Sequence, residues 1–587
     1  MQKVIQWMVA AILICGTAVF TACSSDDDNN NNPPVQPDDD GGNSGTTVGI
    51  TYIERSWDGE KVVDKEVRHG AFWLNEKQVE KGEHFVLNNY WYVTGNHTME
   101  GGLRVEDGDE LNIILCDDAT LTLHYISIEG KSTLRIFGQK RGTGQLIITD
   151  PGDGYCAIGT RNKGGATIEI HGGNITAKGG DRAAAIGECC YGTNNQIWYF
   201  NNINIYGGTI NATGGDGAAA IGGSLYSNGH GNLNIYGGDI TAQGGGYVVY
   251  ELVQGGDFYG GAGIGGGCCG PIESVNIYGG NIHATGGSEA AGIGCGESAE
   301  GKGRNGTGVI NISGGNVEAH GADHAAGIGG GDGVYFGKIT ISGGDVKAHG
   351  GVNAAGIGGG EGAQGGNIEI KGGTVHTWAG ADGAGIGGGE DGDGGTITIS
   401  GGLVFAYGNV SSGFGAGIGG GQDGNSGRIT ISGGEVHAYG GDDAAGIGTG
   451  EETTSGPNIK ADNITISGGA VEAVGGGKGA GVGAGQDAEV GTITITMDSG
   501  SVYVSGRSGD DCGWWAGAFG AYDEDDRGTL NIGKGVKTMS IEKDYSWSTI
   551  PVAWNPVAFA QQRCHVLIQT CDHPGGHTAE TCIFCKH

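Results

Sequence analysis

The sequence has few basic residues. Lysine and arginine together number 31 against 66 aspartates and glutamates, so the chain of 587 residues carries a formal net charge of −35. We expect no nucleic-acid partner, because the phosphate backbone would be repelled rather than neutralised. Direct adhesion to anionic lipid head groups is disfavoured for the same reason. The charge is compatible with divalent cations, neutral glycans or basic partners.

Helical periodicity and a collagen repeat are also missing. Glycine supplies 132 residues, far above the usual share of roughly 7%, yet there is no Gly-X-Y period. Such a composition indicates either disorder or a repeat architecture. The apolar fraction of 37% and the regular Val and Ile positions favour a repeat with a buried core. Helical repeats are excluded, because no 3.6-residue period survives this much glycine.

A short apolar stretch near the N-terminus predicts export. Lys3 precedes the apolar residues Val9 to Phe20, and Thr21-Ala22-Cys23 closes the stretch. This pattern is typical of a secretory signal and is too short for a stable membrane span. Its ending resembles the lipobox of bacterial lipoproteins, and Cys23-Ser-Ser-Asp-Asp-Asp resembles surface lipoproteins of Bacteroides-type bacteria. The resemblance implies a lipidated Cys23 that anchors the protein at the outer membrane or cell surface; a plain signal peptide is the alternative.

Composition divides the chain into five segments. Residues 24–47 are too polar to fold and read as a tether, whereas two aromatic-rich regions are candidates for end caps, since open strand edges template aggregation. The predicted segments are a signal peptide (1–22), a disordered tether (23–48), an N-terminal cap (49–100), the repeat body (101–545) and a C-terminal cap with a Cys/His-rich tail (546–587).

Internal repetition dominates from about Ala166 to Gly500. Paired glycines ending at Gly315, Gly344, Gly373 and Gly402 recur every 29 residues. Each unit holds an Ile-Thr-Ile-Ser piece, a Val-Lys-Ala-His piece and an Ala-Ala-Gly-Ile-Gly piece, and the first two alternate apolar and polar residues as strands do. Glycines at the joints permit tight corners. We therefore predict an all-β fold, a single parallel β-helix with one three-stranded rung per unit; about a dozen rungs at about 4.8 Å give a rod of roughly 55–60 Å.

Three motifs carry a resemblance to a known family. They are Asn89-Tyr-Trp-Tyr-Val-Thr-Gly-Asn-His, Leu111-Asn-Ile-Ile-Leu-Cys-Asp-Asp-Ala-Thr-Leu-Thr and the repeated Ala-Gly-Ile-Gly-Gly-Gly. Over most of residues 85–545 the chain resembles bacterial surface β-helix proteins of the pectin-lyase-like superfamily, often described as carbohydrate-binding-domain-containing. The resemblance implies a right-handed parallel β-helix. It leaves the activity open, because such solenoids host lyases, hydrolases, binders and adhesins alike.

Aligning the repeats produces columns of outward aromatic residues. One column holds His320, His349, Trp378, Tyr407 and Tyr439, its neighbour holds His376, Phe405 and His437 after Glu318 and Lys347, and earlier rungs place Tyr206, Tyr236 and Tyr278 beside Asn204, Asn234 and Asn276. Stacked rings with adjacent hydrogen-bonding groups suit sugars, whose C–H faces pack on aromatics. The alternative is that the ladders only stabilise the sheets, by about 0.2–1 kcal/mol per pair. The first two columns are the candidate glycan-binding residues.

Acidic residues recur in the loop after each Gly-Ile-Gly corner. They are Glu297, Asp332, Glu361, Glu390, Asp391, Asp393, Asp423, Glu451 and Asp487. Carboxylates stacked on successive rungs repel one another unless cations lie between them, and Ca²⁺ is the natural candidate. These loops lack the strict nonapeptide calcium consensus, so a solvated acidic loop is the alternative.

Cysteines suggest two further features. In the tail, Cys571, His573, Cys582 and Cys585 have the spacing of a structural zinc site, with a disulfide as the alternative in an oxidising compartment. In the body, neighbouring cysteines in sequence rarely pair with each other. We therefore expect disulfides between rungs, for example Cys269 with Cys295.

These observations favour a monomeric, lipid-anchored surface solenoid that binds a polysaccharide or host glycan without catalysis. An adhesin or spacer that binds proteins is the first alternative, and a polysaccharide lyase or glycoside hydrolase is the second. Asp442 and Asp443 form a carboxylate pair, but they lie at a turn where other repeats also place aspartate, which favours a turn role. No catalytic residue is assigned.

Overall fold

The computed structural model of the chain describes sixteen stretches of sequence. They are residues 47–74, 89–161, 164–190, 200–226, 231–246, 260–268, 270, 272–297, 304–453, 458–496, 501–505, 518–520, 528–532, 538–543, 546–550 and 565–569. The predicted signal peptide, nearly all of the tether and the Cys/His-rich tail lie outside these residues.

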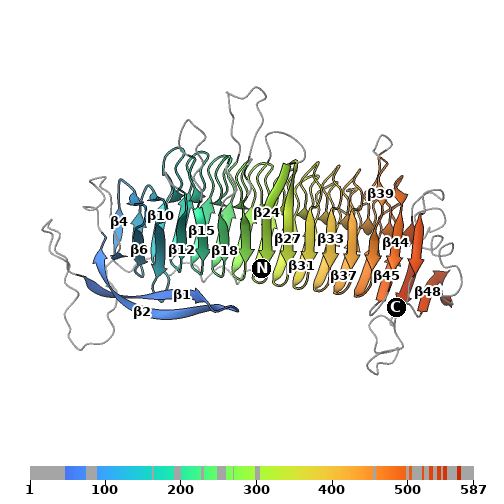
Figure 1. Ribbon diagram of the computed structural model, residues 1–587, viewed down its shortest axis with the longest axis horizontal. Helices are drawn as coiled ribbons and strands as arrows, with labels where there is room; N and C mark the ends of the chain where they lie inside the picture. Colours follow the sequence, from blue (N-terminus) through green and yellow to red (C-terminus); the bar gives the residue numbers. More distant parts are fainter. Residues whose placement is uncertain are drawn as a thin grey trace, which may run out of the picture.

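The described residues form the predicted all-β solenoid. Figure 1 shows a rod in which successive strands stack side by side along the long axis. Each rung contributes one strand to each of three sheets, which we call the first, second and third sheet in chain order. The strands within each sheet of the rod pair in parallel, and the third sheet holds 14 strands. At about 4.8 Å per rung, 14 rungs span roughly 60–65 Å.

The strand bounds follow this three-part order. The first sheet of the rod contains β3 (Asn89–Val93), β6 (Glu110–Leu115), β9 (Thr133–Gly138), β12 (Ala166–Ile170), β15 (Phe200–Ile205), β18 (Asn232–Ile235), β21 (Ser274–Ile277), β24 (Arg304–Ile312), β27 (Val334–Ile341), β30 (Asn367–Ile370), β33 (Thr396–Ile399), β36 (Arg428–Ile431), β40 (Ile464–Ile466), β44 (Thr492–Ile495) and β47 (Thr529–Ile532). The second contains β4 (Asn96–Thr98), β7 (Thr120–Thr122), β10 (Gln145–Ile148), β13 (Asn174–Lys178), β16 (Thr209–Thr213), β19 (Asp239–Gln243), β22 (Asn281–Thr285), β25 (Asn316–His320), β28 (Asp345–His349), β31 (Thr374–Trp378), β34 (Leu403–Tyr407), β37 (Glu435–Tyr439), β41 (Ala470–Val474) and β45 (Ser501–Ser505). The third contains β5 (Leu103–Val105), β8 (Ile126–Ile128), β11 (Ile158–Thr160), β14 (Ile186–Glu188), β17 (Ile221–Gly222), β20 (Ile264–Gly265), β23 (Ile293–Gly294), β26 (Ile328–Gly329), β29 (Ile357–Gly358), β32 (Ile386–Gly387), β35 (Ile418–Gly419), β38 (Ile447–Gly448), β42 (Val482–Gly483) and β46 (Phe519–Gly520).

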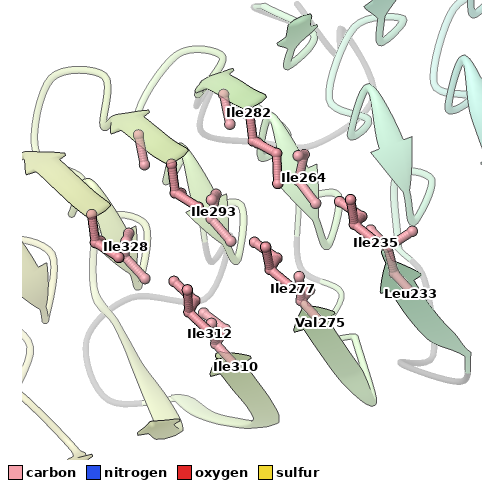
Figure 2. Packing of buried hydrophobic residues seen from close by; sticks show 14 of the residues in the cluster. Leu233, Ile235, Ile264, Val275, Ile277, Ile282, Ile293, Ile310, Ile312 and Ile328 are labelled. Atoms are coloured by element: carbon pink, nitrogen blue, oxygen red, sulfur yellow. The ribbon is translucent and has the colours of Figure 1, made fainter. Parts of the chain in front are cut away.

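The core is a column of stacked aliphatic side chains enclosed by the three sheets. Figure 2 shows Ile264, Ile293 and Ile328 of the third sheet in line, facing Ile277 and Ile312 of the first sheet. All five are fully buried. Burying one such side chain contributes roughly 1.5–3 kcal/mol, so each rung gains its stability by covering the apolar side of the next.

Glycine is required where neighbouring backbones almost touch. Gly358 of β29 has φ +137°, and a Cβ atom there would lie 2.0 Å from the carbonyl oxygen of Gly387 in β32. A side chain at this position would be strained by its dihedral and would overlap the next rung. The Gly of each Ile-Gly pair therefore records close packing between rungs, which explains much of the unusual composition.

A long hairpin, β1 (Val48–Trp57) and β2 (Val62–Trp73), lies along the N-terminal half of the rod (Figure 1). The two strands pair with each other antiparallel, and the last residues of β2 also pair in parallel with β3. At the other end, β48 (Thr538–Lys543), β49 (Ser546–Ile550) and β50 (His565–Gln569) add antiparallel strands, with β50 paired to β45. Both additions cover strand edges that would otherwise pair with other chains.

Two smaller features complete the described fold. β39 (Lys460–Ala461) and β43 (Glu489–Val490) form a separate two-stranded parallel sheet. A disulfide joins Cys156 and Cys189 of neighbouring rungs, which confirms that bridges run between rungs. Cys295 is instead a free, buried thiol, and Cys269 lies outside the described residues. Burial raises the pKa of Cys295 to about 12, which keeps this thiol protonated.

Candidate ligand-binding face

The outer face of the second sheet displays the predicted aromatic columns. Within the second sheet, each strand from β13 to β41 has five residues. The second and fourth residues point into the core, and the first, third and fifth point outward. Neighbouring strands pair residue for residue without a shift. Equivalent positions therefore form straight columns along the rod, and we name them by their position in the strand.

The fifth-position column is a continuous stack of rings. The ring centroids of His320 and His349 are 4.5 Å apart, those of His349 and Trp378 4.3 Å, and those of Trp378 and Tyr407 6.2 Å. Tyr407 and Tyr439 follow at 5.1 Å. Interplanar angles stay between 4° and 11°. All five side chains are half-buried, so the column presents ring edges to its surroundings, while the ring faces lie against one another.

The third-position column runs beside it. His376 stacks on Phe405 at 4.6 Å, and Phe405 stacks on His437 at 4.7 Å. The two columns meet where the ring of His376 lies 5.8 Å from that of Trp378. The structure therefore brings all eight predicted residues together on one face, in two adjacent stacks that share the strands β31, β34 and β37.

Carboxylates close the C-terminal end of the columns. Nδ1 of His437 lies 2.6 Å from Oε2 of Glu472, and its Nε2 lies 3.2 Å from Oε1 of Glu435. The Tyr439 hydroxyl donates to the same Glu472 oxygen at 3.0 Å. The hydrogen bond to Glu472 raises the pKa of His437, and burial raises the pKa of Tyr439. These contacts fix the rings and leave polar groups beside them.

The N-terminal end of the columns holds a different group. A group of three side chains here could hold a metal ion: His283 of β22, and Glu318 and His320 of β25. One ligand atom of each lies within 4.8 Å of the other two. The hydrogen bond from His320 holds the pKa of Glu318 below its usual range. One rung further, burial and the neighbouring His320 lower the pKa of His349. Sequence alignment could have found His283, because it pairs directly with Glu318.

The predicted acidic loops lie beside the third sheet. Glu289, Glu297 and Asp332 bring their carboxylates within 4.8 Å of one another and form a second group that could hold a metal ion. Burial, with Glu361 and Glu289 nearby, raises the pKa of Asp332 to about 6. Burial and the neighbouring Asp443 raise the pKa of Glu451 to about 7. Both shifts combine burial, the larger cause, with repulsion from neighbouring carboxylates.

Other carboxylates in these loops have structural partners. Asp393 accepts a hydrogen bond from the backbone N–H of Asn425 in the next rung at 2.9 Å, and Asp423 accepts one from Thr453 N–H at 2.8 Å. Glu361 accepts from the ring of His324. Several acidic residues therefore tie successive loops together, in addition to charging the surface.

The tyrosine column of the earlier rungs differs from its prediction. Tyr206, Tyr236 and Tyr278 stack at 4.9 and 4.8 Å, but Trp57 of the hairpin packs 5.4 Å from both Tyr236 and Tyr278. The expectation of an open column was therefore wrong, because the hairpin that covers it comes from a distant part of the sequence. The asparagines beside it are also occupied: Asn234 donates to Asn204 at 2.9 Å, and the same ladder continues along the rod.

Two predicted sites lie outside the described residues. One is Cys23, the expected lipidation site. The other is the tail set of Cys571, His573, Cys582 and Cys585. Among the residues that the structure describes, no helix is long and apolar enough to cross a membrane.

Comparison with known families agrees with the three-stranded rungs. A family model described as "Beta helix repeat" matches residues 168–187, 203–225, 275–297, 310–332, 339–361, 368–390, 397–422 and 429–451. The chain is a β-helix repeat protein. Each of the last six matches runs from the first-sheet strand through the second sheet to the acidic loop of one rung. No curated protein and no solved structure matches this β-helix repeat protein.

Proposed function

We propose that this β-helix repeat protein is a lipid-anchored surface protein that binds polysaccharide along the outer face of its second sheet. The observation that carries the proposal is the pair of adjacent ring stacks from His320 to Tyr439, on a face that no described segment covers. Two adjacent aromatic columns offer a long apolar strip of ring edges along which consecutive sugars can pack. A straight column on a rigid rod suits an extended polymer better than a small molecule enclosed in a cavity.

Polar groups beside the rings support the same ligand class. Glu435, Glu472 and Lys347 flank the columns, and they supply both hydrogen-bond acceptors and donors. Sugar hydroxyls need such partners next to the apolar ring faces. The strongly negative chain favours a neutral or cationic glycan over a polyanionic one.

Anchoring and metals complete the proposal. Lipidation of Cys23 would hold the rod at the outer membrane, with the polar segment after it as a tether. We assign Ca²⁺ to the oxygen-rich group of Glu289, Glu297 and Asp332, because Ca²⁺ prefers clustered carboxylates. We assign structural Zn²⁺ to the Cys/His-rich tail.

The test is a glycan array with polysaccharide pull-down on residues 49–587, with calcium or with chelator, while sugar release is monitored. The Trp378→Ala, Tyr407→Ala, Tyr439→Ala variant removes three consecutive rings and is expected to abolish binding. A matched control is the double variant Tyr125→Ala, Tyr155→Ala. It removes two stacked rings whose centroids are 5.7 Å apart and which lie outside the second sheet. Loss of binding in the triple variant alone establishes the face as the site.

Other outcomes replace the proposal. Release of unsaturated or reducing sugar identifies an enzyme and overturns the non-catalytic assignment. Absence of binding to every glycan makes an adhesin or spacer that binds proteins the leading function. Equal loss in the triple variant and the control places the binding elsewhere on the rod.

A further inference from the structure

Three side chains converge at the N-terminal end of the aromatic columns. His283 occupies the third position of β22, and Glu318 lies directly opposite it in β25. His320 follows two residues later in β25 and projects from the same face. The group therefore lies on two hydrogen-bonded strands of the rigid rod, with no loop residue in it.

The spacing of the ligand atoms suits a single ion. Oε1 of Glu318 lies 3.1 Å from Nε2 of His320, and Oε2 lies 3.8 Å from Nδ1 of His283. Nitrogen and oxygen ligands that each bind one zinc ion at about 2.0–2.2 Å lie roughly 3–4 Å apart. Small side-chain rotations are enough to place one ion between the three groups.

Ring orientation marks the same place as special. From His320 to Tyr439 the rings stack nearly parallel, and His320 and His349 differ by only 4°. His283 and His320 are instead tilted by 54° at 5.3 Å. The two residues lie in different columns, because Thr285 precedes His320 in the fifth-position column and His283 precedes Glu318 in the third. The tilt of this diagonal pair turns ring nitrogens toward the carboxylate between them.

We propose that His283, Glu318 and His320 bind a divalent transition-metal ion of the zinc class. Two imidazoles and one carboxylate match the preference of Zn²⁺, whereas Ca²⁺ takes oxygen ligands. The site is distinct from the oxygen-rich group beside the third sheet and from the Cys/His-rich tail. Three protein ligands leave at least one coordination position for a water molecule or an external oxygen ligand.

The surroundings indicate where that open position leads. A hollow of about 220 Å³ borders His283 and Glu318 and is lined by Asp239, Asn281 and Asn316. The same three residues line a larger groove of about 570 Å³ under the hairpin tip. An ion here would lie at the start of the ring columns, and, resting on the proposed function, it would bind hydroxyl or carboxylate oxygens of a glycan that lies along them.

The test measures zinc bound by the full chain, without any glycan. Equilibrium dialysis against Zn²⁺ should show one more equivalent in the wild type than in the His283→Gln, Glu318→Gln variant. At this site the variant should lose affinity at least about 100-fold, beyond the range seen when outer-shell partners are removed. The tail contributes equally to both proteins, and a Cys582→Ser, Cys585→Ser background removes its contribution.

A matched control separates metal binding from folding. His349→Gln removes the next ring of the column, stacked on His320 but outside the group, and should retain the full zinc equivalent. Lys347 lies opposite Glu318 in β28, so Lys347→Gln removes a repelling charge and should tighten zinc binding severalfold. Equal zinc content in the wild type and the double variant would overturn the proposal, as would unchanged or weaker binding in Lys347→Gln. If glycan binding survives the loss of this zinc, the ring columns remain the glycan site, and the inference that the ion contacts the glycan is overturned.

Discussion

Two aromatic ladders of this rod have the same ring geometry and different surroundings. The covered column contains Phe137, His171, Tyr206, Tyr236 and Tyr278 at the end of the first-sheet strands, and the open columns are those of the second sheet. Tyr206 and Tyr236 stack at 4.9 Å and 6°, and Tyr407 and Tyr439 stack at 5.1 Å and 7°. Yet Trp57 of the hairpin packs on the rings of the first, whereas the rings of the second contact one another and polar side chains of their own sheet. Stacking alone therefore does not distinguish a structural ladder from a binding surface.

The length of the covered column follows the length of the hairpin. Tyr52 packs on Phe137 at one end, and Trp57 packs on Tyr278 at the other. In the next two rungs the equivalent positions are Ser313 and Ser342, each bonded to the rod in the same way as Tyr278. Aromatic residues in this column end where their cover ends. By the same reasoning, the rings of the open columns require a different explanation, and a ligand supplies one.

The largest expected contrast is in stability. Phe137 is only 1% exposed and lies between Tyr52 at 4.5 Å and His171 at 4.6 Å. Phe137→Ala should therefore lower the free energy of unfolding by about 3–5 kcal/mol, the usual cost of emptying a buried aromatic site. Tyr407→Ala should cost about 1 kcal/mol or less, as expected for one cross-strand pair on an outer face. Chemical denaturation of both variants checks the difference.

This pair of variants can break the comparison directly. If Tyr407→Ala destabilises the protein as much as Phe137→Ala, the open columns are structural and the case for a ligand is lost. Limited proteolysis tests whether the hairpin unfolds by itself. Cleavage near β1 and β2 should increase in Phe137→Ala and stay unchanged in Tyr407→Ala.

The second contrast is in pH dependence. His171 is 6% exposed, its Nδ1 contacts the backbone of Arg55, and burial lowers its pKa. Glu169 and Glu54 favour the charged ring but do not offset burial. The unfolded state therefore binds more protons than the native state, so stability is full above about pH 6.5 and falls as the pH drops through the lowered native pKa. We expect the hairpin to detach more readily in acid.

A variant without the titrating group tests this expectation. His171→Phe keeps an aromatic ring between Phe137 and Tyr206 and removes the proton site. Its thermal midpoint should change less between pH 7 and pH 5 than that of the wild type. An identical acid response in both proteins would assign the effect to other groups, with the carboxylates of the acidic loops as the next candidates.

The sequence predicted that the rings of both ladders point outward in columns. It did not predict that the hairpin covers one of them, and the reason is physical. Alternation and glycine spacing determine which residues face outward, so the repeat pattern alone is enough to align Trp378, Tyr407 and Tyr439 in one column. Whether an outward ring is covered depends on a contact between Trp57 and Tyr278, which are far apart in the chain and share no repeat pattern. Periodicity describes each rung against its neighbour and carries no information about a segment outside the repeat.

The candidate metal group shows an intermediate case. Glu318 and His320 were in the aligned columns, and His283 is one rung earlier in the same register. A longer alignment would have included it. The tilt of its ring and the distances to Glu318, however, depend on side-chain rotamers that no repeat pattern determines.

The smallest expected effect is the pH dependence of stability at His437, which has the opposite sign to that at His171. His437 is 21% exposed, and its hydrogen bond to Glu472 raises its pKa, against burial and with help from Glu435. Its contribution to stability is therefore present below the unfolded pKa and is lost as the pH rises through the raised native pKa, opposite to His171. Glu472→Gln should lower the pKa of His437 toward its ordinary value. It should lower the free energy of unfolding in acid by less than about 1 kcal/mol, since the pair is only partly buried.

An NMR titration of the His437 ring measures the shift, and Glu361→Gln, on another face of the rod, is the control. A His437 titration that stays unchanged in Glu472→Gln would mean that Glu472 does not order the open columns. Opposite signs at His171 and His437 would instead show that two ladders with one ring geometry are held by different physical means, burial in the covered column and exposed polar contacts in the open ones.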